Sequence, residues 1–282
     1  MRVLIIGAGG LLGGALLKTW TGDDVTGLNS SQLDIRDPAR VLEHIGRLRP
    51  DQIVLAAAFT NVDACESEPE KAFAVNRDGA VHVAEAARMF SARLLFVSTD
   101  YVFDGQKRQP YEVSDPRGPI NVYGCSKAEA ELRLMELVLG CCIVRTSWLF
   151  DVGRRCFPET ILQLAELKSE LQVVNDQRGC PTYAPDLARA IIELCRQQVS
   201  GVVHVTNDGD CTWFDLAQWL LQVSNSASKV RAVSSDSIQR PARRPAYSVL
   251  SAASRVGRGI AMPDWQNAVE RYVERRSQEL VQ

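Results

Sequence analysis

The sequence predicts an α/β protein with a Rossmann-like, doubly wound parallel sheet and a second, smaller α/β domain. Three observations support this fold class. Short apolar runs alternate with stretches of helical periodicity through the first half of the 282 residues. Several runs are apolar throughout, as expected of strands buried on both faces of a parallel sheet. A glycine-rich loop follows the first run and opens the first helix, which is typical of a nucleotide-binding turn.

Strands and helices are expected to alternate along residues 1–149. The expected strands are residues 2–6, 25–28, 52–58, 93–98 and 141–145, and the expected helices are 11–20, 38–48, 70–90 and 121–139. Helix 38–48 illustrates the pattern, because its apolar residues recur on one face and Pro38 stands in the first turn, where proline is tolerated. Crossovers of one hand between such strands build a parallel sheet with helices on both faces.

Residues 150–282 are less regular. Helices are expected at 158–168, 185–198, 212–223 and 263–281, and strands at 202–205 and 230–233. Thr212 is expected to cap its helix, with Asp215 three residues on. The serine-rich stretch 224–237 is expected to be mainly a loop. Because no linker separates the halves, we expect the second domain to be woven from the C-terminal half, with the chain free to cross back and complete the sheet.

The composition excludes several functional classes. With 46% hydrophobic and 23% charged residues and a net charge of -2, the chain resembles neither a disordered nor a nucleic-acid-binding protein. No apolar run reaches the roughly 18 residues of a membrane span, and the run after Met1 is too short for a signal peptide, so we expect a cytoplasmic protein. The cysteines form no C-x-x-C pair and the histidines are far apart, so we expect mostly buried thiols and no structural zinc site.

The loop after the first strand has the sequence Gly7-Ala8-Gly9-Gly10-Leu11-Leu12-Gly13. It departs from a strict G-x-G-x-x-G motif, but its glycines fit the spacing G-x-x-G-x-x-G. Glycines permit a tight turn and let backbone amides approach a pyrophosphate, and the N-terminus of the next helix favours that anion. The loop therefore predicts a dinucleotide site, with a ligand-free glycine turn as the alternative.

The second expected strand ends without the carboxylate that NAD-selective sites usually place on the ribose hydroxyls. Residues 28–31 are Leu-Asn-Ser-Ser, so no acid there repels a 2′-phosphate, and Arg36 is near in sequence. We therefore expect NADPH as the cofactor, with NADH tolerated. Asp34 is a candidate acceptor for the adenine amino group, and an ordinary turn aspartate is the alternative.

Candidate catalytic residues stand in three segments. Residues 98–105 are Ser-Thr-Asp-Tyr-Val-Phe-Asp-Gly and residues 145–148 are Arg-Thr-Ser-Trp, each near the end of an expected strand. Between them, Tyr123 and Lys127 form a Y-x-x-x-K pair, whose side chains share one helix face because residues i and i+4 are neighbours. Ligands of an open parallel sheet bind outside the carboxyl ends of its strands, so these segments are expected to meet.

These residue types suit the reduction of a ketone. The Lys127 ammonium is expected to lower the pKa of Tyr123 from about 10, which would make this phenol an effective acid–base group near neutrality. Tyr123 would protonate the ketone oxygen, the Thr99 hydroxyl would orient it, and Lys127 would also bind the nicotinamide ribose. The alternative is a solvated Tyr–Lys pair on an exposed helix face, because Y-x-x-x-K alone is a weak motif.

Blocks of sequence along nearly the whole chain carry a family resemblance. The most specific are residues 176–182 (Asp-Gln-Arg-Gly-Cys-Pro-Thr) and 244–250 (Arg-Pro-Ala-Tyr-Ser-Val-Leu), which lie outside the cofactor half. The others are residues 33–35, 56–60, 62–63, 66–68, 74–76, 98–105, 121–127, 145–148, 201–204 and 212–213. In these blocks the chain resembles the dTDP-4-dehydrorhamnose reductase family of extended short-chain dehydrogenases/reductases.

The resemblance implies roles for individual residues. Thr99, Tyr123 and Lys127 would be catalytic. The cofactor would contact Gly7, Gly10, Leu11, Leu12, Gly13, Asp34, Ile35, Ala57, Ala58, Thr60, Tyr123 and Lys127, and the sugar nucleotide would contact Thr99, Asp100, Phe103, Asn121, Trp148 and Arg244. Trp148 offers a flat apolar face and Arg244 a bidentate donor for a diphosphate, with a core tryptophan and a solvated arginine as the alternatives. Residues 1–149 would be the NAD(P)-binding domain and 150–282 mainly the substrate-binding domain.

The resemblance also implies an activity, the NADPH-dependent reduction of dTDP-4-dehydro-L-rhamnose to dTDP-L-rhamnose in nucleotide-sugar and polysaccharide biosynthesis. It implies a small-molecule substrate, a possible homodimer, and no nucleic-acid or membrane partner. Ala15 and Gly14 replace a carboxylate through which some family members are associated with magnesium, so we expect no metal requirement. Two alternatives stay open: a ketoreductase for another nucleotide-linked 4-keto-6-deoxy sugar, and a non-catalytic NADP-binding regulatory subunit of methionine adenosyltransferase.

Overall fold

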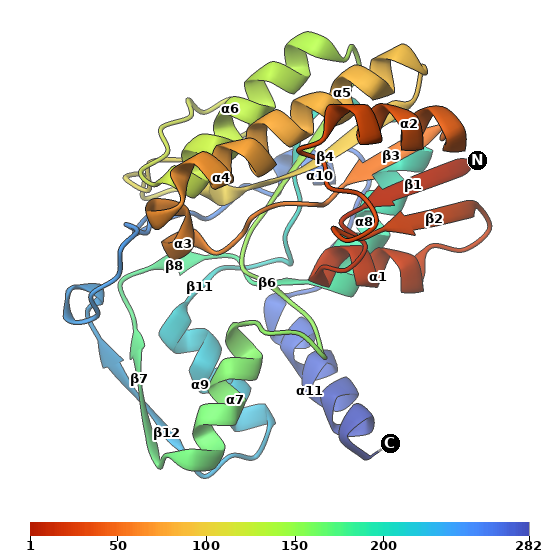
Figure 1. Ribbon diagram of the computed structural model, residues 1–282. Coiled ribbons are helices and arrows are strands. Elements are labelled where there is room, and N and C mark those ends of the chain that lie inside the picture. Colours follow the sequence, from red (N-terminus) through yellow and green to blue (C-terminus); the bar gives the residue numbers. More distant parts are fainter. Residues whose placement is uncertain (282) are drawn as a thin grey trace.

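The computed structural model, which describes residues 1–281, contains the predicted Rossmann-like parallel sheet (Figure 1). Its six strands lie in the order β10-β5-β4-β3-β1-β2. Their bounds are β1 (Arg2–Ile6), β2 (Asp24–Leu28), β3 (Gln52–Leu55), β4 (Arg93–Thr99), β5 (Cys142–Thr146) and β10 (Gly201–His204). Since β10 comes from the C-terminal half, this sheet draws on residues beyond 149.

Helices cover both faces of the sheet, because its strands carry apolar side chains in both directions. In β1, Val3 and Ile5 pack with α1 (Leu11–Thr19) and α8 (Ala184–Arg196). Leu4 and Ile6 join the opposite cluster, formed with α2 (Pro38–Leu48), α5 (Gly79–Met89) and α6 (Val122–Leu137). Successive side chains of a strand alternate between faces, which is why an uninterrupted apolar run predicts a strand buried on both.

The rest of the C-terminal half forms a smaller α/β layer, seen below the sheet in Figure 1. Helices α7 (Phe157–Leu167), α9 (Trp213–Val223) and α11 (Trp265–Val281) surround a separate apolar cluster. The short strand pairs are β7 (Glu170–Val174) with β12 (Lys229–Val233), β8 (Arg178–Gly179) with β11 (Cys211–Thr212), and β6 (Leu149–Phe150) with β9 (Thr182–Tyr183). Thr212 caps α9 as expected, because its Oγ1 accepts from the Asp215 amide (3.1 Å) while its own amide donates to Asp215 Oδ2 (2.9 Å).

Two expected elements differ from the structure. The helix expected at 70–90 is interrupted, because α4 (Pro69–Phe73) leads into a π-helical turn, Ala74–Asp78, before α5 begins. The strand expected at 52–58 ends at Leu55, although the Ala56 amide still donates to the Ile6 carbonyl of β1 at 2.9 Å. Further short helices are α3 (Val62–Ser67) and α10 (Ala253–Val256), and 3-10 turns occur at Asp100–Val102 and Ser235–Ser237.

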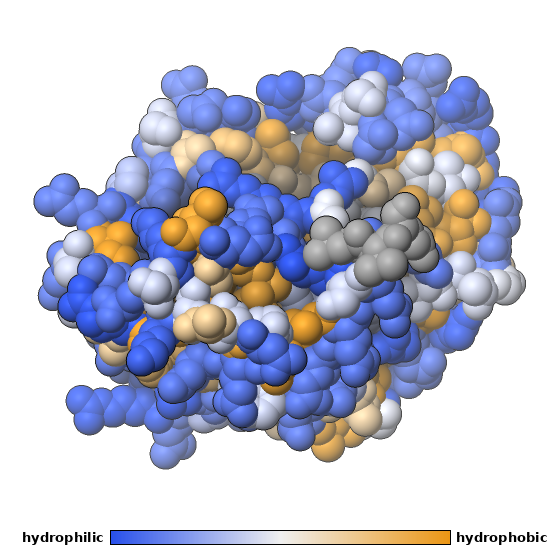
Figure 2. Space-filling model, turned by 90° about the horizontal axis from the view of Figure 1, so that it is seen from below, coloured by the Kyte–Doolittle hydropathy of each residue, from blue (hydrophilic) through white to orange (hydrophobic). Residues whose placement is uncertain are grey.

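Two features bear on the expectations from the composition: the polarity of the surface and the burial of the cysteine side chains. No helix within residues 1–281 is both long and apolar enough to span a membrane. The face in Figure 2 is mainly hydrophilic, with separate hydrophobic residues scattered over it. All the cysteines are free, and all are buried except Cys125 and Cys156, which are half-buried.

Residues 240–251 return to the loops at the carboxyl end of the sheet. Tyr111 and Leu250 form an isolated parallel bridge there. Gly105, three residues after the 3-10 turn Asp100–Val102, has a φ of +78°, and a Cβ on it would lie 2.4 Å from Pro245 Cβ. This close contact joins the segment after β4 to the C-terminal part of the chain.

We expect Gly105→Ala to lower the free energy of unfolding by about 2 kcal/mol or more, since a left-handed backbone conformation and an overlap with Pro245 both oppose the new methyl group. Gly22→Ala is the matched control, because Gly22 has a φ of +83° but no atom within 4 Å of a built Cβ. The control should lose only about 1 kcal/mol in urea unfolding. Equal losses in the two variants would contradict a steric role for Pro245.

Candidate active site

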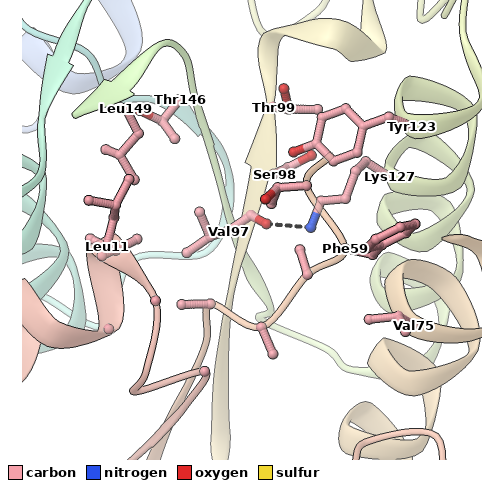
Figure 3. Close-up of a pocket in the computed structure, with 18 of the residues that line it drawn as sticks. Leu11, Phe59, Val75, Val97, Ser98, Thr99, Tyr123, Lys127, Thr146 and Leu149 are labelled. Atoms are coloured by element: carbon pink, nitrogen blue, oxygen red, sulfur yellow. Dashed lines mark hydrogen bonds between the residues drawn. The ribbon is translucent and has the colours of Figure 1, made fainter. Parts of the chain in front are cut away.

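The carboxyl ends of the parallel strands meet in one cavity of about 1010 Å³. Its walls come from the loops that follow β1, β3, β4 and β5, together with residues of α6. After β1 the chain adds β2 on one side and β3 on the other, so the direction of winding reverses here. Such a switch point is where open α/β sheets bind their ligands. Figure 3 shows part of this cavity, with Leu11 and Leu149 on one wall and Tyr123 and Lys127 on the other.

The glycine loop leaves room for a phosphate group. Gly7 has a φ of +97°, and a Cβ on it would lie 2.5 Å from the Ala57 amide nitrogen. A Cβ on Gly13 would lie 2.2 Å from the Gly7 carbonyl oxygen, so the turn and the start of α1 can pack this closely only with glycines. No side chain caps the N-terminus of α1 at Gly10. Its first backbone amides are therefore available to an anion, as a pyrophosphate site requires.

Every residue expected to contact the cofactor lines this cavity. These residues are Gly7, Gly10, Leu11, Leu12, Gly13, Asp34, Ile35, Ala57, Ala58, Thr60, Tyr123 and Lys127. The structure thus brings together segments that are more than a hundred residues apart in sequence. Their contacts with a cofactor stay a prediction.

The loop that follows β2 carries an ion pair beside the cavity. The Arg36 guanidinium donates to both carboxylate oxygens of Asp34, with 2.9 Å between Nε and Oδ1 and 2.5 Å between Nη2 and Oδ2. This pairing holds the pKa of Asp34 below its usual value. Arg36, Asn29 and Ser30 all line the cavity, and no carboxylate stands at residues 28–31. Because the Asp34 carboxylate is paired with Arg36 and residues 28–31 hold no acid, no unpaired carboxylate between residues 28 and 36 opposes a 2′-phosphate.

Helix α6 and the end of β4 hold the predicted catalytic residues together. Gly124 is the reason that they approach so closely, since a Cβ on it would lie 2.2 Å from the Tyr101 carbonyl oxygen. Thr99, Tyr123 and Lys127 all line the cavity, and they stand on the same wall in Figure 3. The Lys127 Nζ donates to the Val97 carbonyl oxygen at 2.7 Å.

The electrostatics of this pair differ from the expectation. Burial lowers the pKa of Lys127 to about 7 and raises the pKa of Tyr123 above its usual value. The expected lowering of the Tyr123 pKa by Lys127 is therefore wrong for the free chain. The reason is that the lysine donates to backbone and lies in surroundings that themselves disfavour charge. A phenol with a raised pKa keeps its proton at neutral pH, which suits a proton donor.

A buried ionic cluster anchors α6 to the sheet. Glu131 is fully buried, and its Oε1 accepts from Ser98 Oγ at 2.6 Å and from Arg145 Nε at 2.9 Å. Its Oε2 accepts from Arg145 Nη2 and from Arg117 Nε, each at 2.7 Å. The charge of Glu131 also acts to raise the pKa of Lys127, one helical turn away, against the effect of burial. This cluster thus ties the Tyr–Lys face of α6 to both β4 and β5.

Asn76 is a structural residue of the site that received no role from the sequence. It lies in the π-helical turn and is buried. Its Oδ1 accepts from the Phe59 amide at 2.7 Å, and its Nδ2 donates to the Phe59 carbonyl (3.1 Å) and to Ser126 Oγ (3.0 Å). Asn76 therefore joins the cavity loop after β3 to the turn of α6 between Tyr123 and Lys127. The only sequence signal was its place in the block 74–76.

The residues expected to contact a sugar nucleotide fall into two groups. Thr99, Asp100 and Trp148 line the cavity, whereas Phe103, Asn121 and Arg244 are not among its lining residues. Asp100 is buried, and its Oδ2 makes no hydrogen bond of good geometry among the described residues. Burial raises the pKa of Asp100 to about 7, although the nearby hydroxyls of Ser248 and Thr99 act against this rise. An orphaned acceptor at the cavity wall fits a ligand that brings a hydroxyl group.

The second group, Phe103, Asn121 and Arg244, contacts other residues near the cavity. Phe103 stacks on Tyr111, with ring centroids 4.2 Å apart. Asn121 caps α6, since its Oδ1 accepts from the Gly124 amide (2.8 Å) while its Nδ2 donates to the Arg243 carbonyl (2.8 Å). Arg244 is a bidentate partner of Asp63, with 2.5 Å from Nη1 to Oδ1 and 2.8 Å from Nη2 to Oδ2. Direct substrate contacts of all six residues stay predictions.

No cluster of three or more histidine, cysteine, aspartate or glutamate side chains suited to a metal ion occurs within the described part of the chain. Ala15 is buried in the core beneath the glycine loop. Metal independence is a property that only an assay with a chelator tests.

Comparison with known proteins places this site in a family. The family model named RmlD substrate binding domain matches residues 1–278. The chain belongs to this family. The predicted resemblance to dTDP-4-dehydrorhamnose reductases is confirmed. Curated relatives and solved structures of that name match this chain over nearly its full length.

Three comparisons illustrate the likeness. The spore coat polysaccharide biosynthesis protein SpsK of Bacillus subtilis is 39% identical over 98% of each chain. The dTDP-4-dehydrorhamnose reductase of Sinorhizobium fredii is 37% identical over 97% of each chain. Among solved structures, dTDP-4-dehydrorhamnose reductase from Bacillus anthracis in complex with NADP is 36% identical, with a TM-score of 0.94 over 96% of this chain and 98% of that one.

We expect Lys127→Met to abolish activity while stabilising the fold in a pH-dependent way. Because the pKa of Lys127 is lowered from 10.5 to about 7, folding penalises its ammonium form. This cost is fully present below about pH 7 and fades as the pH rises towards 10.5. Thermal unfolding should therefore show a larger gain in Tm at pH 6 than at pH 9. Lys18→Met, at an exposed residue of α1, is the control, and equal gains at both pH values in Lys127→Met would contradict the argument.

Proposed function

We propose that the chain catalyses the NADPH-dependent reduction of the 4-keto group of dTDP-4-dehydro-L-rhamnose, forming dTDP-L-rhamnose. The observation that carries this proposal is the meeting of Thr99, Tyr123 and Lys127 at the carboxyl end of β4, in the same cavity as the glycine loop. The names of the relatives supply the substrate, since reductases of this sugar nucleotide match nearly the whole chain.

The residues present fit NADPH. The glycine loop and the uncapped N-terminus of α1 would hold its pyrophosphate, and Arg36 with Asn29 and Ser30 would meet its 2′-phosphate. Lys127 donates one of its three N–H groups to Val97, so the other two are available for the hydroxyls of the nicotinamide ribose. NADPH, when bound, supplies the hydride that reduces the keto carbon. The relative solved with NADP supports this choice of cofactor.

Tyr123 is the proton donor in this mechanism. Its raised pKa keeps the phenol protonated until the substrate oxygen gains negative charge and becomes the stronger base. The Thr99 Oγ1 now donates to Asp100 Oδ1 at 3.0 Å, and rotation about one bond turns this donor to the substrate oxygen. Lys127 stabilises the phenolate that Tyr123 becomes, because a nearby ammonium favours that charge.

Asp100 and Trp148 are the proposed substrate contacts nearest to the reacting carbon. The orphaned Oδ2 of Asp100 would accept from a sugar hydroxyl, which satisfies a buried polar atom. Trp148 would cover the apolar side of the 6-deoxy sugar. Phe103, Asn121 and Arg244 are proposed to act on the substrate through the walls that they support. The division into a cofactor-binding part, residues 1–149, and a mainly substrate-binding part, residues 150–282, belongs to this proposal.

Wider aspects of the sequence interpretation also stay proposals. The likeness to SpsK supports a role in polysaccharide biosynthesis. The free cysteines fit the reducing conditions of the cytoplasm, where we place the enzyme. A homodimer stays a prediction. The regulatory-subunit alternative is not favoured, because the proton donor, its lysine and the orienting hydroxyl all face the cavity.

The activity is tested by following NADPH absorbance with the purified chain, enzymatically generated dTDP-4-dehydrorhamnose and EDTA. We expect rapid oxidation of NADPH and formation of dTDP-L-rhamnose. Full activity only after addition of a divalent cation would overturn metal independence. Turnover confined to a different 4-keto-6-deoxy sugar nucleotide would overturn the substrate.

Tyr123→Phe should lower kcat by about 100-fold or more, because it removes the proton donor and keeps the ring. The dissociation constant for NADPH should stay within a few-fold of the wild-type value, measured by fluorescence titration. Turnover within a few-fold of wild type would show that another group donates the proton.

A further inference from the structure

Trp148 is held in an unusual backbone conformation at the cavity wall. Its φ is +46°, a value that bulky side chains rarely adopt. The structure around it must therefore determine this conformation. Two residues from the blocks that carry the family resemblance pack against its ring, and neither has a role in the mechanism above: Gly179 and Trp213.

Trp213 forms a stack with Trp148. The two ring centroids are 3.5 Å apart and the planes differ by only 7°. Both rings line the cavity, so together they form what we call the tryptophan wall (Trp148 and Trp213). Trp213 is the first residue of α9, and Phe157 of α7 contacts its ring with centroids 4.5 Å apart. Trp213 is thus fixed by the core of the smaller layer and fixes Trp148 in turn.

Gly179 limits the position of Trp148 from its edge. A Cβ on Gly179 would lie 2.6 Å from Cε2 of the Trp148 ring and 2.8 Å from its Cζ2. Only a glycine at this position leaves the ring where it is. The pairing of β8 with β11 brings Gly179 opposite Cys211, two residues before Trp213. One short strand pair therefore positions both residues that hold Trp148.

The tryptophan wall begins close to the catalytic hydroxyl. In the ladder between β4 and β5, Thr99 lies opposite Thr146, and Trp148 follows two residues later. In a 4-keto-6-deoxy sugar, the carbon that bears the methyl group is bonded directly to the reacting carbon. A keto oxygen held by Tyr123 and Thr99 therefore brings the methyl side of the sugar ring within reach of this wall, while the thymine base lies a diphosphate further away.

We propose that Trp213 and Gly179 are positioning residues that determine sugar specificity, because they hold Trp148 as an apolar wall for the 6-deoxy sugar ring. This inference rests on the proposed function. An aromatic face stabilises an apolar group beside it by excluding water, and a fixed ring loses little conformational freedom on binding. If Trp148 were free to turn, the wall would lose contact with the sugar but not with the cofactor.

The test compares dTDP-L-rhamnose with dTDP alone, because the two ligands differ only by the deoxysugar. Their affinities for the full chain saturated with NADP are measured by calorimetry for wild type, Trp213→Ala and Gly179→Ala. We expect each variant to bind dTDP-L-rhamnose about fivefold more weakly or worse. Binding of dTDP and of NADPH should change less than about twofold, and the KM for the keto sugar should rise more than kcat falls. Trp213→Phe should restore part of the affinity.

The matched control is Trp219→Ala. Trp219 lies on the same helix, belongs to the same apolar cluster, donates from Nε1 to the Gln266 carbonyl at 3.4 Å, and is not among the cavity-lining residues. It should lose stability without this difference between the two ligands. Equal weakening of dTDP and dTDP-L-rhamnose would overturn the proposal in favour of a thymine contact. Unchanged affinities in both Trp213→Ala and Gly179→Ala would also overturn it.

The two hypotheses fail in different ways. Absence of dTDP-4-dehydrorhamnose turnover by the wild-type chain would overturn the proposed function, and with it the ligand named for the tryptophan wall. Normal wild-type turnover together with unchanged sugar affinity in the variants would overturn only the role of Trp213 and Gly179.

Discussion

The site depends on the burial of one carboxylate, that of Glu131. Its two oxygens bind Ser98 of β4 and Arg145 of β5, so α6 is fixed to two neighbouring strands of the sheet. A buried ion costs several kcal/mol unless it is paired and hydrogen-bonded, and loss of one partner costs about 3–5 kcal/mol. Both carboxylate oxygens of Glu131 are hydrogen-bonded, and its charge is paired with Arg145 and Arg117. The rest of the site follows, because Tyr123, Lys127 and Glu131 occupy positions i, i+4 and i+8 on the same helix.

Among the described residues, four buried side-chain polar atoms have no hydrogen-bond partner, and two of them, Asp100 Oδ2 and Thr146 Oγ1, belong to residues that line the cavity. Lys127 is buried with a single acceptor among the described residues, the Val97 carbonyl, and one oxygen of Asp100 has no partner of good geometry there. Both groups have pKa values shifted to about 7 by burial. A protein selected for stability alone would replace such groups, so their retention at one cavity points to ligand binding. The same reasoning applies to the left-handed conformation of Trp148.

Sequence patterns predicted the parts of the fold that local rules determine. Uninterrupted apolar runs predicted the buried strands, and the glycine spacing predicted the turn in which Gly7 and Gly13 leave no room for a Cβ. The Y-x-x-x-K pair predicted that Tyr123 and Lys127 share one face of α6, and both line the cavity. The π-helical turn at Asn76 was missed, because its cause is a set of distant hydrogen bonds to Phe59 and Ser126. Strand β7 was missed because its partner β12 lies far along the chain.

The pKa values in the site and the contacts of residues that do not line the cavity were harder to predict. The sign of the Tyr123 pKa shift depends on burial, which no spacing of tyrosine and lysine reveals. The positions of Phe103, Asn121 and Arg244 behind the wall follow from partners such as Tyr111, Arg243 and Asp63, all set by tertiary structure. The stack of Trp148 on Trp213 likewise joins two segments that are more than sixty residues apart in the sequence.

In the proposed reaction, hydride passes from the cofactor directly to the 4-keto carbon of a deoxysugar nucleotide. The most direct measurement uses NADPH that carries deuterium at both C4 positions of the nicotinamide, with dTDP-4-dehydrorhamnose in ordinary water. We expect NMR spectra of the product to show one deuterium on C4 of the rhamnose ring and none elsewhere. Deuterium at another carbon, or a product whose C4 hydrogen comes from water, would rule out direct hydride transfer to C4.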